Sequence, residues 1–421
     1  MNIKLDKCNS RNIMAAKLWI EDGSRADPKD KKGIHQILSS TILRGCGPYN
    51  NKKLAEIVEN SGASLNCDTY EDGILISLKC IESDAYNLLP LIGWMITKPL
   101  LEKDQIELEK DLTIKAIKRQ KESTYQLAFD GWRKIVYANG PYGHDPLGSI
   151  SDINKINRDN LLSIGNSLTY RNKNLVISGK FPVDIDSYIK DLFAFKNINK
   201  NDLNKSKTTD KKNNSEYNHI KNKSSIYTKS INTQQVIILL GKATIKYENK
   251  ADIMLRLISC YLGYGMSSLL FKTLRERYGV VYEAGIYHPI RENHTPFIMH
   301  ASTTEEKAIL TLKLLKECWY RVIESEITDE ELYILKIKYR GQIAHSLQSI
   351  SQRAEHKAHL LGIGIKENQE KETLLRLESI NSKEIRNAAN LYLRSPYLSI
   401  CSNKEVVQKI SKCWDTSFKD D

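Results

Sequence analysis

The chain has 421 residues, 41% hydrophobic and 27% charged, which is the composition of a globular protein with room for more than one core. The formal net charge of +12 does not indicate a nucleic-acid partner, because nine lysines lie within the single stretch 196–229, as is typical of a solvated linker. The eight cysteines form no C-x-x-C pair, which excludes a readable disulfide framework or thiolate zinc site.

The sequence also argues against a membrane protein. The longest apolar stretch, 88–101, is interrupted by two prolines and a lysine and is too short to span a bilayer. The N-terminus has no apolar signal core, and the scattered cysteines fit a reducing compartment. We therefore expect a cytoplasmic protein without a membrane span.

Strands and helices alternate along the chain. Alternating or continuous apolar runs predict strands over 15–20, 174–179, 235–241 and 296–302, and a hairpin over 63–80. Helical periodicity predicts helices over 34–44, 51–60, 84–97, 103–121, 251–261, 266–277, 305–323 and 329–348. This mixture predicts an α+β fold in which helices pack on antiparallel-rich sheets.

A polar segment divides the chain near its middle. Residues 196–231 are rich in Lys, Asn, Ser and Thr and lack the apolar residues that a core needs. They predict a linker between an N-terminal half, 1–195, and a C-terminal half, 232–421.

The two halves are related as a repeat. At a constant offset of 226 residues, Ser123 matches Ser349 and Gln126 matches Gln352. Thr328 and Glu331 form a capping-box pattern before the helix of the second copy. The layout predicts two homologous halves.

Four segments together resemble the insulinase/pitrilysin-type zinc metallopeptidases, in particular the mitochondrial-processing-peptidase-like branch. They are EDGSRADPKDKKGIHQILSSTILRG (21–45), PYGHDPLGSISDINKINRDNL (141–161), RNKNLVISGKF (171–181) and YLGYGMSSLLFKTLRERYGVVYEAG (261–285). The resemblance covers nearly the whole chain. It implies two α+β halves of the processing-peptidase (LuxS-like) sandwich type, and a chamber that two such modules close around a peptide.

The resemblance also implies a zinc motif, His-x-x-Glu-His, on the first helix of the catalytic half. Positions i and i+4 lie on one helix face, so two imidazoles can meet one metal ion while the Glu accepts a proton. Anchored on Gly33 and on Arg44-Gly45, this motif falls on residues 36–40. Gln36 and Ser40 occupy the imidazole positions, and Ser39 occupies the position of the base.

The later helix departs from the family pattern as well. Glu109 matches the first of two family carboxylates, but Ala116 stands where the third zinc ligand is expected. His35 is one position away from the motif and has no partner at i+4, so shifting the register gives no better donor set. We expect no catalytic zinc at this place in the chain.

A second family feature is present. Arg275 and Tyr282, seven residues apart in LRERYGVVYEAG, match an Arg/Tyr pair that faces the zinc site in some relatives. The pattern places Arg275 on a last helical turn and Tyr282 on a strand that includes 280–283. The plain alternative is a surface ion pair of Arg275 with Glu276 or Glu283, and a half-buried strand tyrosine.

These features give one main hypothesis and two rivals. The main hypothesis is a non-catalytic subunit of a heterodimeric zinc peptidase, which binds peptide substrates and lends Arg275 and Tyr282 to a partner chain that holds the zinc. The first rival is a proteolytically inactive scaffold of the same fold. The second rival, a peptidase active alone with an unusual metal site, needs ligands that the sequence does not show.

Overall fold

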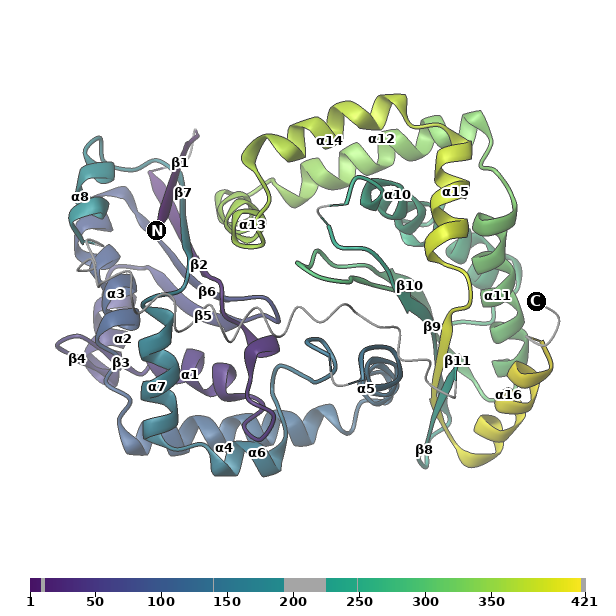
Figure 1. Cartoon of the computed structure of the whole chain (residues 1–421), viewed down its shortest axis with the longest axis horizontal. Coiled ribbons are helices and arrows are strands. Elements are labelled where there is room, and N and C mark those ends of the chain that lie inside the picture. The colour runs from purple at the N-terminus through teal and green to yellow at the C-terminus, as the bar shows by residue number, and fades with distance from the viewer. Residues whose placement is uncertain (9–11, 139, 193–224, 248, 418–421) are drawn as a thin grey trace. The chain divides into compact units, whose positions relative to one another are not determined.

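The computed structural model describes residues 1–8, 12–138, 140–192, 225–247 and 249–417 (Figure 1). The chain divides into two compact units, each built from three segments. Unit 1 comprises Met1–Ile117, His144–Lys221 and Ser346–Lys366; unit 2 comprises Lys118–Gly143, Asn222–His345 and Glu367–Asp421.

Unit 1 is a five-stranded sheet packed with helices. The strand order is β1-β7-β2-β6-β5; β1 pairs parallel with β7, and the other pairs are antiparallel. Its strands are β1 (Asn2–Lys7), β2 (Ile13–Ile20), β5 (Ser64–Thr69), β6 (Ile74–Ile81) and β7 (Lys173–Gly179), with a small ribbon of β3 (Gly45–Cys46) and β4 (Tyr49–Asn50). Its helices are η1 (Ser24–Ala26), α1 (Ile34–Ile42), α2 (Asn51–Asn60), η2 (Glu82–Asp84), α3 (Ala85–Thr97), α4 (Lys103–Gln120), α6 (Ile150–Lys155), α7 (Arg158–Leu168), α8 (Ile185–Leu192) and α13 (Ile350–Gly362).

Unit 2 repeats this plan. Its sheet order is β10-β11-β9-β12-β8, again with one parallel pair, β12 with β8, at one edge. The strands are β8 (Ile226–Ser230), β9 (Gln235–Ala243), β10 (Glu283–Tyr287), β11 (Pro296–Thr304) and β12 (Tyr397–Ser402). The helices are α5 (Thr124–Tyr137), α10 (Asp252–Gly263), the π-helical η3 (Phe271–Arg277), α11 (Ala308–Glu324), α12 (Asp329–Ser346), α14 (Glu367–Ser379), α15 (Ser382–Tyr392) and α16 (Lys404–Ser417).

The two sheets have the same topology, strand for strand. Each contains a central strand flanked by two antiparallel neighbours and ends in a parallel edge pair. The expectation of an α+β fold with two homologous halves is therefore confirmed.

Strand β2 shows how the apolar residues divide between the faces of the first sheet. Its even-numbered residues, such as Ala16 and Leu18, pack into the main core with α1, α3 and α7. Ala15 and Trp19 point the other way, into a smaller cluster with Ala354 and Ala358 of α13. Both faces of the sheet are thus buried, which explains why β2 is apolar almost throughout.

Helices α5 and α13 are exchanged with respect to the sequence halves. Helix α5 belongs to the first half of the sequence but packs on β8, β9 and β12 of unit 2, and α13 packs on β2 and β7 of unit 1. Ser123 caps the N-terminus of α5, accepting from the Gln126 amide at 3.3 Å, and Ser349 caps α13 through the Gln352 amide at 3.1 Å. The repeat offset of 226 therefore corresponds to equivalent helix starts.

The predicted capping box of α12 is present. Thr328 Oγ1 accepts from the Glu331 amide at 3.2 Å, and Glu331 Oε2 accepts from the Thr328 amide at 3.1 Å. Two unpaired donors of the first helical turn are satisfied in this way.

Some boundaries differ from the sequence prediction. Most of the predicted linker, 196–224, lies outside the described residues, but residues 226–230, assigned to the same linker, form strand β8. The strand predicted to include 280–283 begins only at Glu283, because the turn at Gly279 (φ 57°) is followed by irregular backbone. The helix predicted over 266–277 is shorter and ends in the π-helical segment η3.

The structure can be compared with two expectations from the sequence, which concern membrane-spanning helices and disulfide bonds. In the described part of the chain, no helix is long and apolar enough to cross a membrane. All eight cysteines are free thiols.

Candidate functional site

Helix α1 is fixed in place by its first residue and by its apolar side. Gly33 has φ 93°, and a Cβ there would lie 2.5 Å from the carbonyl oxygen of Leu147, so only glycine fits. Ile34, Ile37, Leu38 and Ile42 are buried in the unit 1 core. The sequence GIHQILSSTI therefore gives a short buried helix whose polar residues point to its remaining side.

The positions of the family zinc motif are occupied by side chains that bond within the helix. Ser40 Oγ donates to the Gln36 carbonyl at 2.9 Å, and Gln36 is half-buried. Ser39 is fully buried; its hydroxyl donates to the Gln36 carbonyl at 3.0 Å and lies 2.6 Å from Thr69 Oγ1. These hydroxyls are already satisfied, and Gln36 offers only a neutral amide.

Helix α4 supplies no ligand either. Ala116 is half-buried and carries no donor atom. Glu109, about two turns away on the same helix, is buried and bound by Arg44, with Nε at 2.6 Å and Nη2 at 2.5 Å from Oε1. The Arg44–Glu109 pair holds α4 to the segment that follows α1.

These residues do not fit a zinc ion. Structural and catalytic zinc sites use Cys, His, Asp or Glu donors, and the positions here are Gln, Ser, Ser and Ala. Among the residues that the structure describes, no group of three or more His, Cys, Asp or Glu side chains is placed to hold a metal ion.

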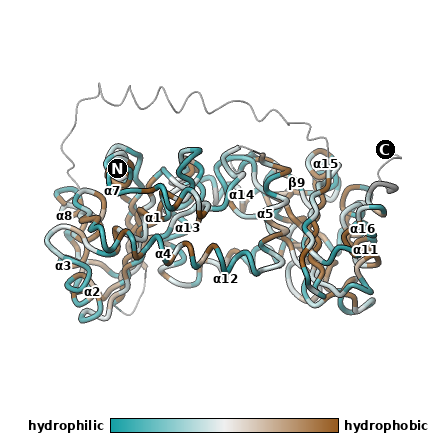
Figure 2. The backbone as a smooth tube through the Cα atoms, turned by 90° about the horizontal axis from the view of Figure 1, so that it is seen from below, coloured by the Kyte–Doolittle hydropathy of each residue, from teal (hydrophilic) through white to brown (hydrophobic). Residues whose placement is uncertain are grey.

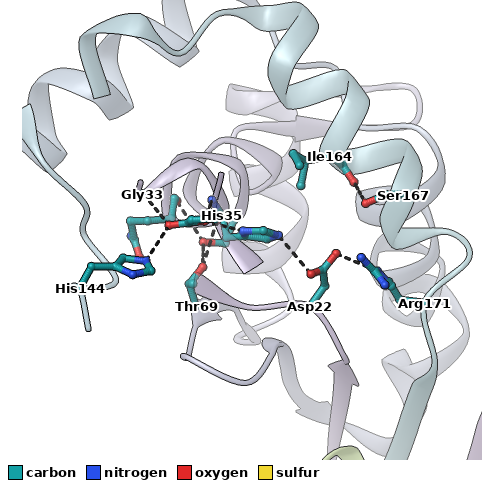
Figure 3. Close-up of polar contacts among 11 residues, drawn as sticks. Asp22, Gly33, His35, Thr69, His144, Ile164, Ser167 and Arg171 are labelled. Atoms are coloured by element: carbon teal, nitrogen blue, oxygen red, sulfur yellow. Dashed lines mark hydrogen bonds and ion pairs between the residues drawn. The ribbon is translucent and has the colours of Figure 1, made fainter. Parts of the chain in front are cut away.

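A buried chain of charged groups lies at the start of the same helix (Figure 3). His35 Nδ1 is 2.6 Å from Asp27 Oδ1, and His35 Nε2 is 3.6 Å from Asp22 Oδ1. All three side chains are almost completely inaccessible to solvent. Asp27 also accepts from the Gly33 amide at 2.5 Å, so it caps α1 as well.

Two further side chains, Arg171 and His144, extend the chain at its ends. Arg171 Nε donates to Asp22 Oδ2 at 2.9 Å, and His144 Nε2 lies 3.4 Å from Asp27 Oδ2. Thr69 Oγ1 donates to the His35 carbonyl at 3.1 Å. The side chains contact one another in the order Arg171, Asp22, His35, Asp27, His144, and we call this set the ion chain of α1.

These contacts shift the pKa values of His35, Asp22 and Asp27. Burial alone would lower the pKa of His35, but the hydrogen bonds and charges of Asp22 and Asp27 outweigh it and raise the pKa to about 9. Burial alone would raise the pKa of Asp22 and of Asp27, but their partners lower both pKa values below the usual range. A charged imidazolium between two carboxylates is the state that this geometry stabilises.

Sequence reasoning missed most of the ion chain. The sequence identifies His35 only as a residue beside the zinc-motif positions 36–40. Asp22, Asp27, His144 and Arg171 lie in the segments that carry the family resemblance, but their side chains meet only in the folded unit. The sequence gives one indication of the ion chain: three of the segments that carry the family resemblance, 21–45, 141–161 and 171–181, supply its Asp, His and Arg residues.

The other predicted site residues lie in unit 2. Arg275 is exposed on the π-helical segment η3, and its guanidinium carbon is 5.3 Å from the centre of the Phe271 ring. In the described part of the chain it forms no ion pair with Glu276 or Glu283, so the plain alternative of a helix-end pair is absent. A π-helical turn is uncommon and is frequent at functional sites.

Tyr282 stands just before β10 rather than within a strand. Its amide donates to the Ser302 carbonyl at 2.9 Å, which fixes the backbone, while its side chain is 71% exposed. The half-buried strand tyrosine of the plain alternative is therefore not what the structure has. Arg275 and Tyr282 are thus both exposed side chains of unit 2.

Two α+β repeats, with helix α1 of the first repeat at the position of the zinc motif, define the class of two-repeat zinc-peptidase homologues. Residues 5–148 match the profile of the insulinase family, peptidase family M16, and residues 156–339 match the profile of the peptidase M16 inactive domain. The chain belongs to peptidase family M16, which confirms the resemblance inferred from the sequence.

Several relatives align with this chain. An uncharacterized zinc protease of Rickettsia bellii is 24% identical over 353 residues, which is 83% of this chain and 82% of that protein. A non-peptidase homolog, YmxG, of Helicobacter pylori is 23% identical over 92% of this chain and 88% of its own length. The mitochondrial-processing peptidase subunit beta of Saccharomyces cerevisiae is 24% identical over 41% of this chain and 37% of its own length.

A solved structure has the same fold. The crystal structure of a peptidase M16 inactive domain from Pseudomonas fluorescens superimposes with a TM-score of 0.82 at 17% identity. The match covers 96% of both chains.

Proposed function

We propose that this chain is the non-catalytic, substrate-binding subunit of a two-chain M16 zinc peptidase. The observation that carries the proposal is a selective difference between the two units. The zinc positions of unit 1 are occupied by Gln36, Ser39, Ser40 and Ala116. The two serine hydroxyls are hydrogen-bonded within the helix, and Ala116 has no atom that could bind a metal. In unit 2, by contrast, Arg275 and Tyr282 are exposed. The zinc ion belongs, in this proposal, to a homologous partner chain.

The two exposed residues suit the binding of a peptide carbonyl. A guanidinium is always charged and offers several N–H donors, so Arg275 would hold and orient a substrate carbonyl. The phenol of Tyr282 would donate a hydrogen bond to the oxygen on which negative charge develops. Neither residue supplies a nucleophile, which is why a partner is needed for cleavage.

The relatives support this division of labour. One of them is named a non-peptidase homolog, and another is named as one subunit of a processing peptidase. The eight free cysteines favour a reducing compartment, and we propose the cytoplasm as the location.

The test uses a reconstituted complex with a related chain that carries an intact His-x-x-Glu-His motif. We expect no zinc and no peptide cleavage with this chain alone, and both in the complex. Arg275→Ala and Tyr282→Phe should each lower kcat/KM by about 100-fold without affecting assembly, as for loss of an oxyanion donor. Full activity in both variants contradicts the assigned roles.

Unit 2 offers matched controls for these substitutions. Arg277 and Tyr278 are exposed neighbours that stack on each other, with 5.2 Å between guanidinium carbon and ring centre. Arg277→Ala and Tyr278→Phe should leave kcat/KM nearly unchanged. A stable complex without cleavage would instead favour the inactive scaffold.

A further inference from the structure

Helix α12 is apolar on two sides. Leu332, Leu335 and Tyr339 are buried in the unit 2 core, as expected for a helix that packs on one side. On the other side Tyr333, Ile334 and Ile337 are 67%, 46% and 48% exposed. Hydrophobic and polar residues accordingly alternate along this helix in Figure 2.

The exposed face has a protruding aromatic side chain near its N-terminal end and an open space over a glycine near its C-terminal end. Tyr333 is the most exposed large hydrophobic side chain of the helix. Gly341 lies eight residues later and about 80° around the helix, so it shares this face. A Cβ added at Gly341 would meet no atom within 4 Å, and the exposed Ala344 lies one turn beyond it.

The same face is also charged in opposite senses at its two ends. Glu330 is exposed at the N-terminal end of this face, and Arg340 is exposed beyond the apolar centre, about 80° around the helix from Glu330. Two such faces laid antiparallel bring acidic ends beside basic ends. A patch that complements itself in this way is what an isologous two-fold interface requires.

We propose that α12 pairs antiparallel with α12 of a second copy of this chain, about a two-fold axis near Ile337. In this pairing Tyr333 of one copy fills the gap at Gly341 of the other, and the two Ile337 side chains meet. Glu330 lies within one turn of Arg340 of the other copy. The proposal does not depend on the function proposed for Arg275 and Tyr282.

Arg340 already forms an ion pair within its own chain, but this ion pair is compatible with the proposed contact between the two copies of α12. Its Nη2 is 2.7 Å from Glu378 Oε1, but both side chains are about half exposed or more. An exposed pair of this kind is weak, and a guanidinium has five donors, so Arg340 can serve a second carboxylate.

The equivalent helix of the first repeat lacks these features. At the offset of 226 residues, Tyr333 corresponds to Glu107 and Gly341 corresponds to Lys115 on α4. Helix α4 therefore has neither the aromatic projection nor the gap, so the self-complementary face is a property of α12 and not of the repeat.

The expected dimer is weak. A single pair of helices buries less than the roughly 800 Å² per partner of a standard interface, so association should depend on concentration in about the micromolar range. Sedimentation velocity of the full chain over that range, without any partner chain, should show a reversible monomer–dimer equilibrium.

The decisive variant is Gly341→Gln. It fills the gap, so the dimer should weaken about tenfold or more, as for the loss of an interface hot spot. Because glutamine is a better helix former than glycine, the melting temperature of the monomer should rise, which separates this effect from misfolding. Tyr333→Ser should weaken the dimer to a similar extent.

Charge exchange tests the antiparallel register. Glu330→Arg and Arg340→Glu should each weaken the dimer, and the double variant should regain most of it. Leu391→Ser, which removes an apolar side chain 69% exposed on α15, is the matched control and should change nothing.

Two results would overturn the proposal. One is a wild-type chain that stays monomeric at every concentration, including the case in which this face binds a different protein. The other is a dimer that Gly341→Gln and Tyr333→Ser leave intact. Arg275→Ala, by contrast, should affect peptide cleavage in the two-chain complex and not this self-association.

Discussion

His35 Nδ1, at the start of helix α1, and Asp27 Oδ1 are 2.6 Å apart in the interior of unit 1. Asp27 simultaneously caps that helix through the Gly33 amide. The start of α1 is therefore held by the buried charges of His35 and Asp27, which lie beside the motif positions 36–40 and not on them.

Substitution of His35 should make the stability of unit 1 less dependent on pH. The pKa of His35 is raised to about 9 in the folded chain, so its stabilising contribution is complete below the unfolded value of about 6.5. This contribution is lost as the pH rises through about 9. The shift corresponds to roughly 3 kcal/mol at most, and wild-type melting temperatures at pH 6.5 and pH 9.5 should differ accordingly.

His35→Gln should flatten that difference and lower the stability at pH 6.5. The exposed His345 at the end of α12 provides the control, because His345→Gln removes a histidine outside the ion chain. A His35→Gln profile parallel to the wild type would show that the imidazolium does not stabilise the fold.

At acidic pH, stability should depend on pH in the opposite direction, falling as the pH is lowered. The pKa values of Asp22 and Asp27 are lowered, because their partners outweigh the effect of burial. Their stabilisation is present above the unfolded value of about 3.8 and is lost as the pH falls through the folded values. Asp22→Asn should therefore reduce stability at pH 6.5, and its difference from the wild type should shrink as the pH falls below about 3.8, measured by urea unfolding.

Chelation should not affect the isolated chain. Because Gln36, Ser40 and Ala116 form no zinc site, treatment with EDTA should leave its melting temperature unchanged, and zinc content by mass spectrometry should be negligible. A clear loss of stability on chelation would mean that the motif was placed in the wrong register.

The core strands were predictable, and the edge strands were not. Runs such as QVIILLG in β9 are apolar on both faces and bounded by polar residues, which is a strong local signal. β1 and β8 are short edge strands that contain lysines and other polar residues, and their pairing partners lie far away in sequence. Helix α13 was missed as an element because its apolar side matches a sheet of the other half.

The candidate site, too, was only partly predictable from the sequence. The motif positions on α1 could be predicted because they depend on spacing along one helix. The ion chain depends on side chains from Asp22 to Arg171, which only the folded sheet brings together. The exposure of Arg275 also depends on a π-helical turn that sequence periodicity does not reveal.

The exchanged helices predict that the sequence halves do not fold well alone. In a fragment of residues 1–195, the sheet face with Ala15 and Trp19 would lose α13 and expose apolar surface. We expect this fragment to aggregate, and a peptide of residues 346–366 added in trans to increase its soluble, folded fraction by circular dichroism. The peptide with Ala358→Arg should fail, because Ala358 is fully buried against this face.

Gly33 and Gly62 allow the cost of a close approach to be separated from the cost of backbone strain. Both have positive φ, 93° and 57°, so alanine at either position is strained by about 1 kcal/mol or more. A Cβ at Gly62 meets nothing within 4 Å, but at Gly33 it would lie 2.5 Å from the Leu147 carbonyl oxygen. Gly33→Ala should therefore lower the free energy of unfolding by about 2 kcal/mol more than Gly62→Ala, as measured by urea denaturation. Equal losses would mean that the loop containing Leu147 moves away freely and does not fix the start of α1.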